Sequence, residues 1–150
     1  MRKSAMFCLV SGLAACVPSN DPVVVTDSPE LEQRATWQAT LAGTAAFPAV
    51  TGSTQIADFG PYFNATIAVS GASAASAYQW RIFPGTCAAP GTTQFGPVQA
   101  YPNITTNASG AAELTRTIAG PLDLAGAYNV RVSTVATPVR IVACGDLARS

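Results

Sequence analysis

The sequence predicts an all-β domain, an antiparallel Greek-key sandwich or barrel of about seven to eight strands. Three observations support this prediction. Short runs in which apolar and polar residues alternate recur along the chain, as in strands that bury one face. Gly, Pro, Asn and Ser separate these runs at intervals of roughly ten residues, the spacing of short strands joined by turns. No stretch sustains the period of 3.6 residues that an amphipathic helix requires.

The first segment, residues 1–15, has the layout of an export signal. Arg2 and Lys3 provide a positive start, and the apolar run that follows is too short to span a bilayer. Leu-Ala-Ala directly before Cys16 resembles the lipobox of bacterial lipoproteins, in which the signal is cut before a cysteine that carries the lipid. That resemblance implies a lipid on Cys16. The alternative is an ordinary secretory signal with an incidental cysteine.

The residues after Cys16 predict the location of the protein and the start of its folded part. Val17, rather than Asp, follows the cysteine, so the resemblance to Gram-negative sorting signals implies the cell outer membrane, with the domain facing the periplasm or the surface. Several acyl chains would make this membrane attachment stable. Prolines divide residues 16–34, which we expect to form a polar tether. The domain is then expected to span residues 35–150.

Strands are expected where the alternation is clearest. In residues 62–70 and 78–83, every second side chain is large and apolar, so each segment should bury one face. A Gly-Pro turn should join the second and third strands into a hairpin. An irregular loop rich in Gly, Pro and Thr is expected over residues 84–102. The full set of expected strands is 36–42, 53–59, 62–70, 78–83, 111–118, 127–134 and 139–144.

Two short motifs suggest a family. A strand followed by Gly85-Thr86-Cys87, a long loop, and a last strand ending Ala143-Cys144-Gly145 resembles the copper/zinc superoxide dismutase fold and the related chordin-type domains of bacterial exported proteins. The resemblance covers about residues 36–148 and implies a disulfide between Cys87 and Cys144. These are also the only cysteines left after the N-terminal segment, in a compartment that permits disulfides.

The chain departs from that family at the metal ligands. Dismutases carry His-x-His on the strand that here holds Arg81 and Phe83, and a further ligand would fall near Ser133, yet the chain contains no histidine. We therefore expect no bound metal or other cofactor and no dismutase activity. Arg81 is expected to pair with a carboxylate such as Asp146 or with carbonyls of the loop.

Composition leaves few other functions. Without its export signal the chain is slightly acidic and has no cluster of basic residues, which argues against nucleic acid as a partner. Its carboxylates are scattered and no histidine or lysine remains to act as a base, which argues against catalysis. We therefore expect a non-enzymatic interaction or envelope-structural module, with the membrane and an envelope protein as partners. The alternative is an exported enzyme or metal-handling protein with an altered dismutase-type site.

Phe95 and Tyr101 are the remaining candidates for a functional surface. Both lie in the loop at residues 84–102, among small polar residues. They could form a contact surface beside Arg81 and Phe83. They could instead close one end of the sandwich.

Overall fold

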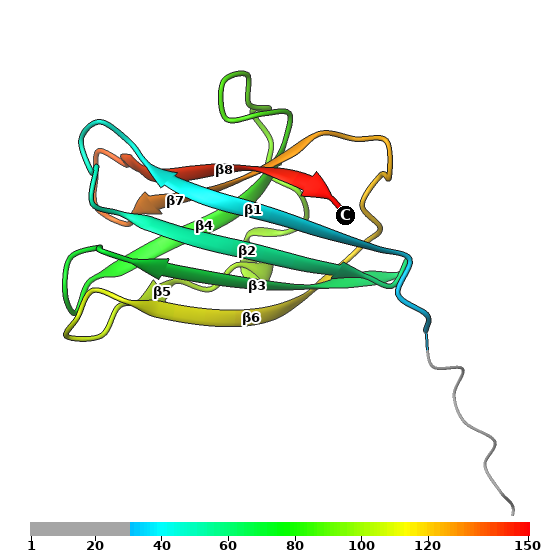
Figure 1. Ribbon diagram of the computed structural model, residues 1–150, viewed down its shortest axis with the longest axis horizontal. Coiled ribbons are helices and arrows are strands. Elements are labelled where there is room, and N and C mark those ends of the chain that lie inside the picture. The colour runs from blue at the N-terminus through cyan, green and yellow to red at the C-terminus, as the bar shows by residue number, and fades with distance from the viewer. Residues whose placement is uncertain (1–30) are drawn as a thin grey trace, which may run out of the picture. The chain divides into compact units, whose positions relative to one another are not determined.

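Eight antiparallel strands curl into a nearly closed barrel in the computed structural model, which describes residues 31–150 (Figure 1). The predicted export signal, Cys16 and the tether up to residue 30 lie outside the described residues. No helix within residues 31–150 has the length and apolar character needed to cross a membrane. The elements are β1 (Ala35–Gly43), β2 (Thr51–Asp58), β3 (Tyr62–Ser70), β4 (Ala77–Pro84), the 3-10 turn η1 (Val98–Ala100), β5 (Ile104–Thr105), β6 (Ala112–Ala119), β7 (Tyr128–Thr134) and β8 (Ile141–Arg149).

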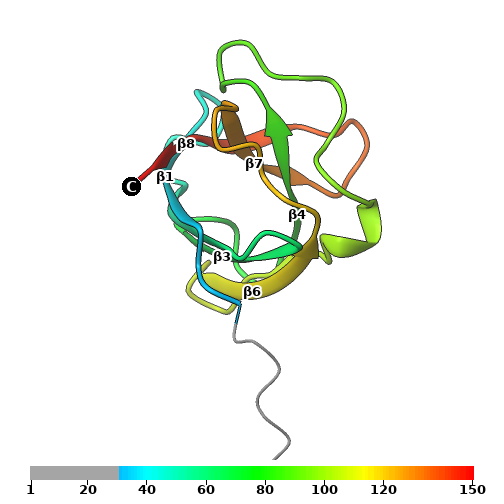
Figure 2. The same cartoon turned by 90° about the vertical axis from the view of Figure 1, so that its right-hand side faces the viewer.

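The strand order has Greek-key character. Hydrogen-bonded neighbours follow the order β5-β4-β7-β8-β1-β2-β3-β6. The two end strands, β5 and β6, also contact each other, so the sheet returns almost to its start, as the end view in Figure 2 shows. Around this ring β7, β4, β5 and β6 are neighbours in turn, which is the arrangement of a Greek key. The predicted all-β class is therefore confirmed, as a single curled sheet.

The interior is built by the alternation that the sequence displays. Phe63, Ala65 and Ile67 of β3 and Trp80 and Ile82 of β4 are fully buried, while the residues that alternate with them are only partly buried. Side chains of a strand alternate between the two faces of its sheet, so each strand contributes one apolar row to the barrel interior. Trp80 also donates its indole N–H to the Pro102 carbonyl at 3.1 Å, which satisfies the polar atom of this side chain.

Two features of the sheet were not predicted. β5 was missed because a strand of two residues is too short to show alternation. β8 was predicted to end at Cys144 but continues to Arg149. The apolar alternation that predicted this strand stops at Gly145. A glycine is required there because β1 passes so close that an added Cβ would lie 2.5 Å from the Thr40 carbonyl oxygen.

The turn between β2 and β3 ties down the start of the domain. The side chain of Asp58 is fully buried and accepts hydrogen bonds from the Gly60 backbone N–H and from the Arg34 guanidinium, both at 2.7 Å. Gly60 has a φ of +95°, a conformation that a residue with a Cβ adopts only at a cost. Because a buried carboxylate is costly unless it is paired, this ion pair anchors the residues that enter β1 to the turn.

A disulfide joins Cys87 to Cys144, as predicted. The two Cα atoms lie 6.0 Å apart. Cys87 lies in the loop after β4, and Cys144 lies in β8, which is separated from β4 by β7. The bond therefore fastens the start of this loop across the outside of β7.

We predict that replacing both cysteines, Cys87→Ser with Cys144→Ser, lowers the free energy of unfolding by roughly 4 kcal/mol, because the bond closes a loop of 57 residues in the unfolded chain. Urea denaturation of the wild-type and double-variant chains measures this difference. Wild-type protein in strong reductant provides the control and should behave as the variant does. An unchanged unfolding midpoint would contradict the stabilising role of the disulfide.

Candidate functional site

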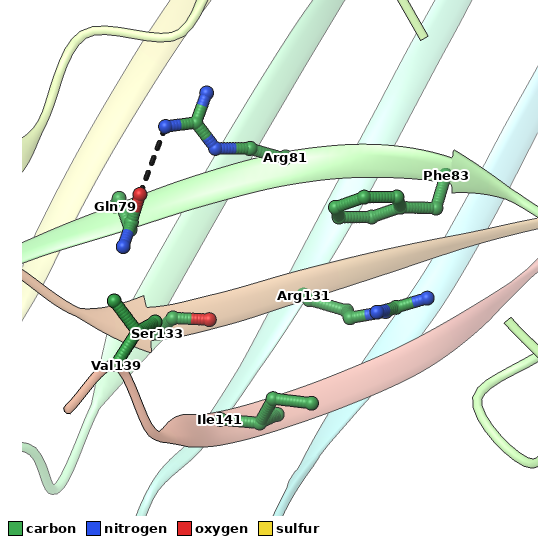
Figure 3. A pocket seen from close by; sticks show the side chains of 7 residues that line it. All are labelled: Gln79, Arg81, Phe83, Arg131, Ser133, Val139 and Ile141. Carbon is green, nitrogen blue, oxygen red and sulfur yellow. Dashed lines mark hydrogen bonds between the residues drawn. The ribbon is translucent and has the colours of Figure 1, made fainter. Parts of the chain in front are cut away.

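The three positions singled out by the family resemblance line one groove. Arg81 and Phe83 lie on β4 and Ser133 on β7, and all three side chains belong to the face that points away from the barrel interior. We call this depression of about 210 Å³ the arginine groove (Figure 3). Its lining is formed by Gln79, Arg81, Phe83, Arg131, Ser133, Val139 and Ile141.

Strand register explains how this lining is assembled. β4 and β7 pair antiparallel, with Gln79 opposite Ser133 and Arg81 opposite Arg131. Directly opposed residues of an antiparallel pair place their side chains on the same face, roughly 5 Å apart at Cβ. The loop after β4 passes outside this strand pair, as the end view shows (Figure 2). The groove is thus an outer surface partly covered by a loop.

Arg81 is held by side-chain amides and not by a carboxylate. Its Nη1 donates to Gln94 Oε1 and its Nη2 donates to Gln79 Oε1, both at 2.8 Å. Gln94 belongs to the loop, so Arg81 links this loop to β4. The expected pairing with Asp146 does not occur, because Asp146 instead accepts the backbone N–H of Cys87.

Arg131 occupies the other end of the groove. Its Cζ lies 4.0 Å from the centre of the Phe83 ring, a cation–π contact, and its Nη2 donates to the Gly91 carbonyl at 3.3 Å. Its Nε donates at 2.9 Å to Asn129 Oδ1. Partial burial lowers the pKa of Arg131 from its ordinary value. The side chain nevertheless stays protonated at neutral pH, because guanidinium is the most basic side-chain group in proteins.

Asn129 is the residue that fixes the position of Arg131. It is fully buried beneath the loop, and its amide Nδ2 donates to the Gly85 carbonyl at 3.0 Å while Oδ1 accepts from Arg131. Sequence reasoning missed both residues. The available signal was the pairing itself, since aligning β4 with β7 places Arg131 opposite Arg81.

The groove does not suit a metal ion. Its polar groups are two guanidinium groups, an amide and a hydroxyl, and two positive charges repel a cation. Across residues 31–150, no group of three or more His, Cys, Asp or Glu side chains is placed to hold one. The donor set of this groove favours an anion instead.

Phe95 and Tyr101 pack inward. Tyr101 is buried with its ring edge-on to Trp80 at 5.0 Å between centroids, and its hydroxyl donates to the Phe95 carbonyl at 2.6 Å. The half-buried Phe95 ring packs against Phe63 and Tyr128. The structure thus places Tyr101 in the core and Phe95 against it. Neither residue lines the arginine groove.

No protein-family model matches this chain, and no curated protein matches it either. Functional inference therefore rests on the residues and their geometry.

We predict that the free energy of unfolding falls as the pH rises above about 10, the ordinary pKa of tyrosine. Burial raises the pKa of the Tyr101 phenol above that value, an effect that the nearby Arg81 charge only partly offsets. The unfolded chain therefore loses this proton first, and stability decreases between the two pKa values.

Tyr101→Phe should remove the part of the stability loss at alkaline pH that Tyr101 causes. At neutral pH it should lower the free energy of unfolding by about 1 kcal/mol, because the hydrogen bond of the hydroxyl is missing. Urea denaturation at neutral and alkaline pH measures both effects. Tyr62→Phe is the matched control, because Tyr62 lies at a turn and stacks on Phe59. An alkaline loss as large in Tyr101→Phe as in the wild type would contradict the assignment.

Proposed function

We propose that this protein is a non-enzymatic binding module, a lipoprotein held at the outer membrane through a lipid on Cys16. The export signal and the lipobox-like residues before Cys16 support the anchor. The bond between the loop cysteine and the last strand supports a dismutase-like barrel, because the same connection is implied by the family resemblance. In this proposal the barrel presents the arginine groove to a ligand from the cell envelope.

One observation carries the proposal. The positions that would hold metal ligands in a dismutase lie together, and they line a groove whose charged groups are Arg81 and Arg131. A guanidinium remains protonated in proteins, so neither arginine can take up a proton as a general base. Guanidinium groups are effective at binding oxyanions through paired N–H donors. Binding is therefore the function that this lining supports best.

We predict that Cys16→Ser abolishes membrane attachment, either by leaving uncleaved precursor or by releasing soluble protein. Detergent phase partitioning of the wild type and the variant, with immunoblotting, distinguishes the two chains. Cys87→Ser serves as the control, since loss of this cysteine should leave partitioning unchanged. A wild-type protein found entirely in the soluble periplasmic fraction would refute the anchor.

We also predict that the purified protein retains neither copper nor zinc stoichiometrically and does not dismutate superoxide. Metal analysis after dialysis against both ions and a superoxide assay measure these properties. The double variant Arg81→His with Phe83→His is the positive control, because it places two imidazoles on one face of β4 and should retain more zinc than the wild type. One tightly held ion per wild-type chain, or activity above free-metal controls, would favour a metal-handling protein instead.

A further inference from the structure

We propose that the arginine groove binds a carboxylate group carried on an aliphatic or peptide body. This inference deepens the proposed function, on which it rests, by assigning the chemical class of the ligand. The contacts of Arg81 and Arg131, the acceptors around them and the apolar rim of the groove each contribute a step.

The first step is the charge of the groove. Arg81 and Arg131 are direct cross-strand neighbours, an arrangement of like charges that destabilises a sheet. Among residues 31–150 the only ion pair is Arg34 with Asp58, so no carboxylate of the described chain neutralises either arginine. A bound anion would reduce this repulsion, which favours its binding.

The second step is the number of unused donors. A guanidinium has five N–H donors. In the described part of the chain, Arg81 uses its two Nη atoms once each, and Arg131 uses Nε and Nη2 once each. Both forks thus retain N–H groups for an additional acceptor. These groups are already oriented, because Asn129 holds Arg131 and the two glutamines hold Arg81.

The third step is the placement of the two guanidinium groups. Arg81 leans toward Gln79, while Arg131 lies under Phe83, so the guanidinium groups point apart along the strand pair (Figure 3). Ser133 lies opposite Gln79, at the end of the groove toward which Arg81 leans, and its hydroxyl can also donate to an anion. A carboxylate at this end would accept from Arg81 and Ser133 and would be attracted by the nearby charge of Arg131.

The fourth step is the apolar rim, which indicates what carries the charge. Val139 and Ile141 line the groove and are 57% and 42% exposed, so they present apolar surface beside the arginines. At about 210 Å³ the groove is smaller than a pocket for a drug-sized ligand, roughly 300–1,000 Å³. It fits a charged group with a few adjoining carbon atoms, such as the last residue of a peptide.

A single negative charge fits better than the double charge of a phosphate group. The guanidinium groups are already surrounded by four fixed oxygens, those of Gln79, Gln94, Asn129 and Gly91. These partial negative charges offset part of the positive field, so the field repays less of the desolvation cost of an anion, and that cost is larger for a dianion than for a monoanion. The groove also contains no lysine, since the only lysine of the chain is Lys3.

The test uses the full-length chain and four probes: acetyl-Ala-Ala with a free carboxylate, its C-terminal amide, acetate and inorganic phosphate. Binding is measured by titration calorimetry and by the shift of the thermal unfolding midpoint, which a ligand of the folded state raises. We expect the free peptide to bind at least ten times more tightly than the amide. Binding of acetate as tight as that of the peptide would indicate that the natural ligand is a small free acid. Tighter binding of the peptide would indicate the carboxylate at the end of a peptide chain.

The variants are Arg81→Gln and Arg131→Gln, each of which should weaken binding of the free peptide about tenfold. Arg116→Gln on β6 is the matched control, with the same charge change on a strand that does not line the groove. Because Arg81→Gln loses the hydrogen bonds to Gln79 and Gln94 while it relieves the repulsion from Arg131, the thermal unfolding midpoint of each ligand-free variant is measured beside its affinity. An arginine variant that loses binding but keeps its unfolding midpoint would show that the arginine serves ligand binding and not the stability of the barrel.

Three results would overturn the inference: equal binding of peptide and amide, tighter binding of phosphate, or equal affinity in all three arginine variants. Each of these leaves the metal and superoxide predictions untouched, so failure of the ligand class is distinct from failure of the proposed function. Conversely, a stoichiometric metal ion in the wild-type protein would refute the proposed function, whether or not the peptide binds.

Discussion

The disulfide between Cys87 and Cys144 is the constraint on which the outer face of the barrel depends. It fastens the loop after β4 at the point where Asp146 also accepts the Cys87 backbone N–H. Asn129 then holds the same stretch of loop through the Gly85 carbonyl. These contacts place Gly91 and Gln94 against the two arginines, so the fastened loop helps to fix the side chains that line the groove.

The two faces of β4 and β7 have separate physical roles. The inner face carries Trp80, Ile82 and Val130, all fully buried, and supplies the hydrophobic stabilisation of this side of the barrel. The outer face carries Arg81 opposite Arg131, a juxtaposition of like charges that is unfavourable in itself and is offset by the hydrogen bonds of both side chains. Residues that break a local rule for stability are expected where function needs them, and the outer face is where this fold tolerates such residues.

Much of the fold could be predicted from the sequence because most strands bury one face and so show strict alternation. β3 runs from Tyr62 to Ser70 as expected, and its apolar row is buried. The prediction failed where pairing partners, rather than local pattern, decide the structure. β5 is too short to show a period. The continuation of β8 was missed because position 145 is a glycine, and β1 leaves no room for a side chain there. Both depend on contacts between segments far apart in sequence.

The candidate site was predictable to a similar extent. The family resemblance singled out Arg81, Phe83 and Ser133 as one group, and the structure brings them together. Arg131 was not predicted because a single arginine in an alternating strand is common. Only the β4–β7 register places it opposite Arg81. The site is therefore a property of the pair of strands. A charge that would be unremarkable alone becomes costly opposite a second one, and that cost is what an anionic ligand would relieve.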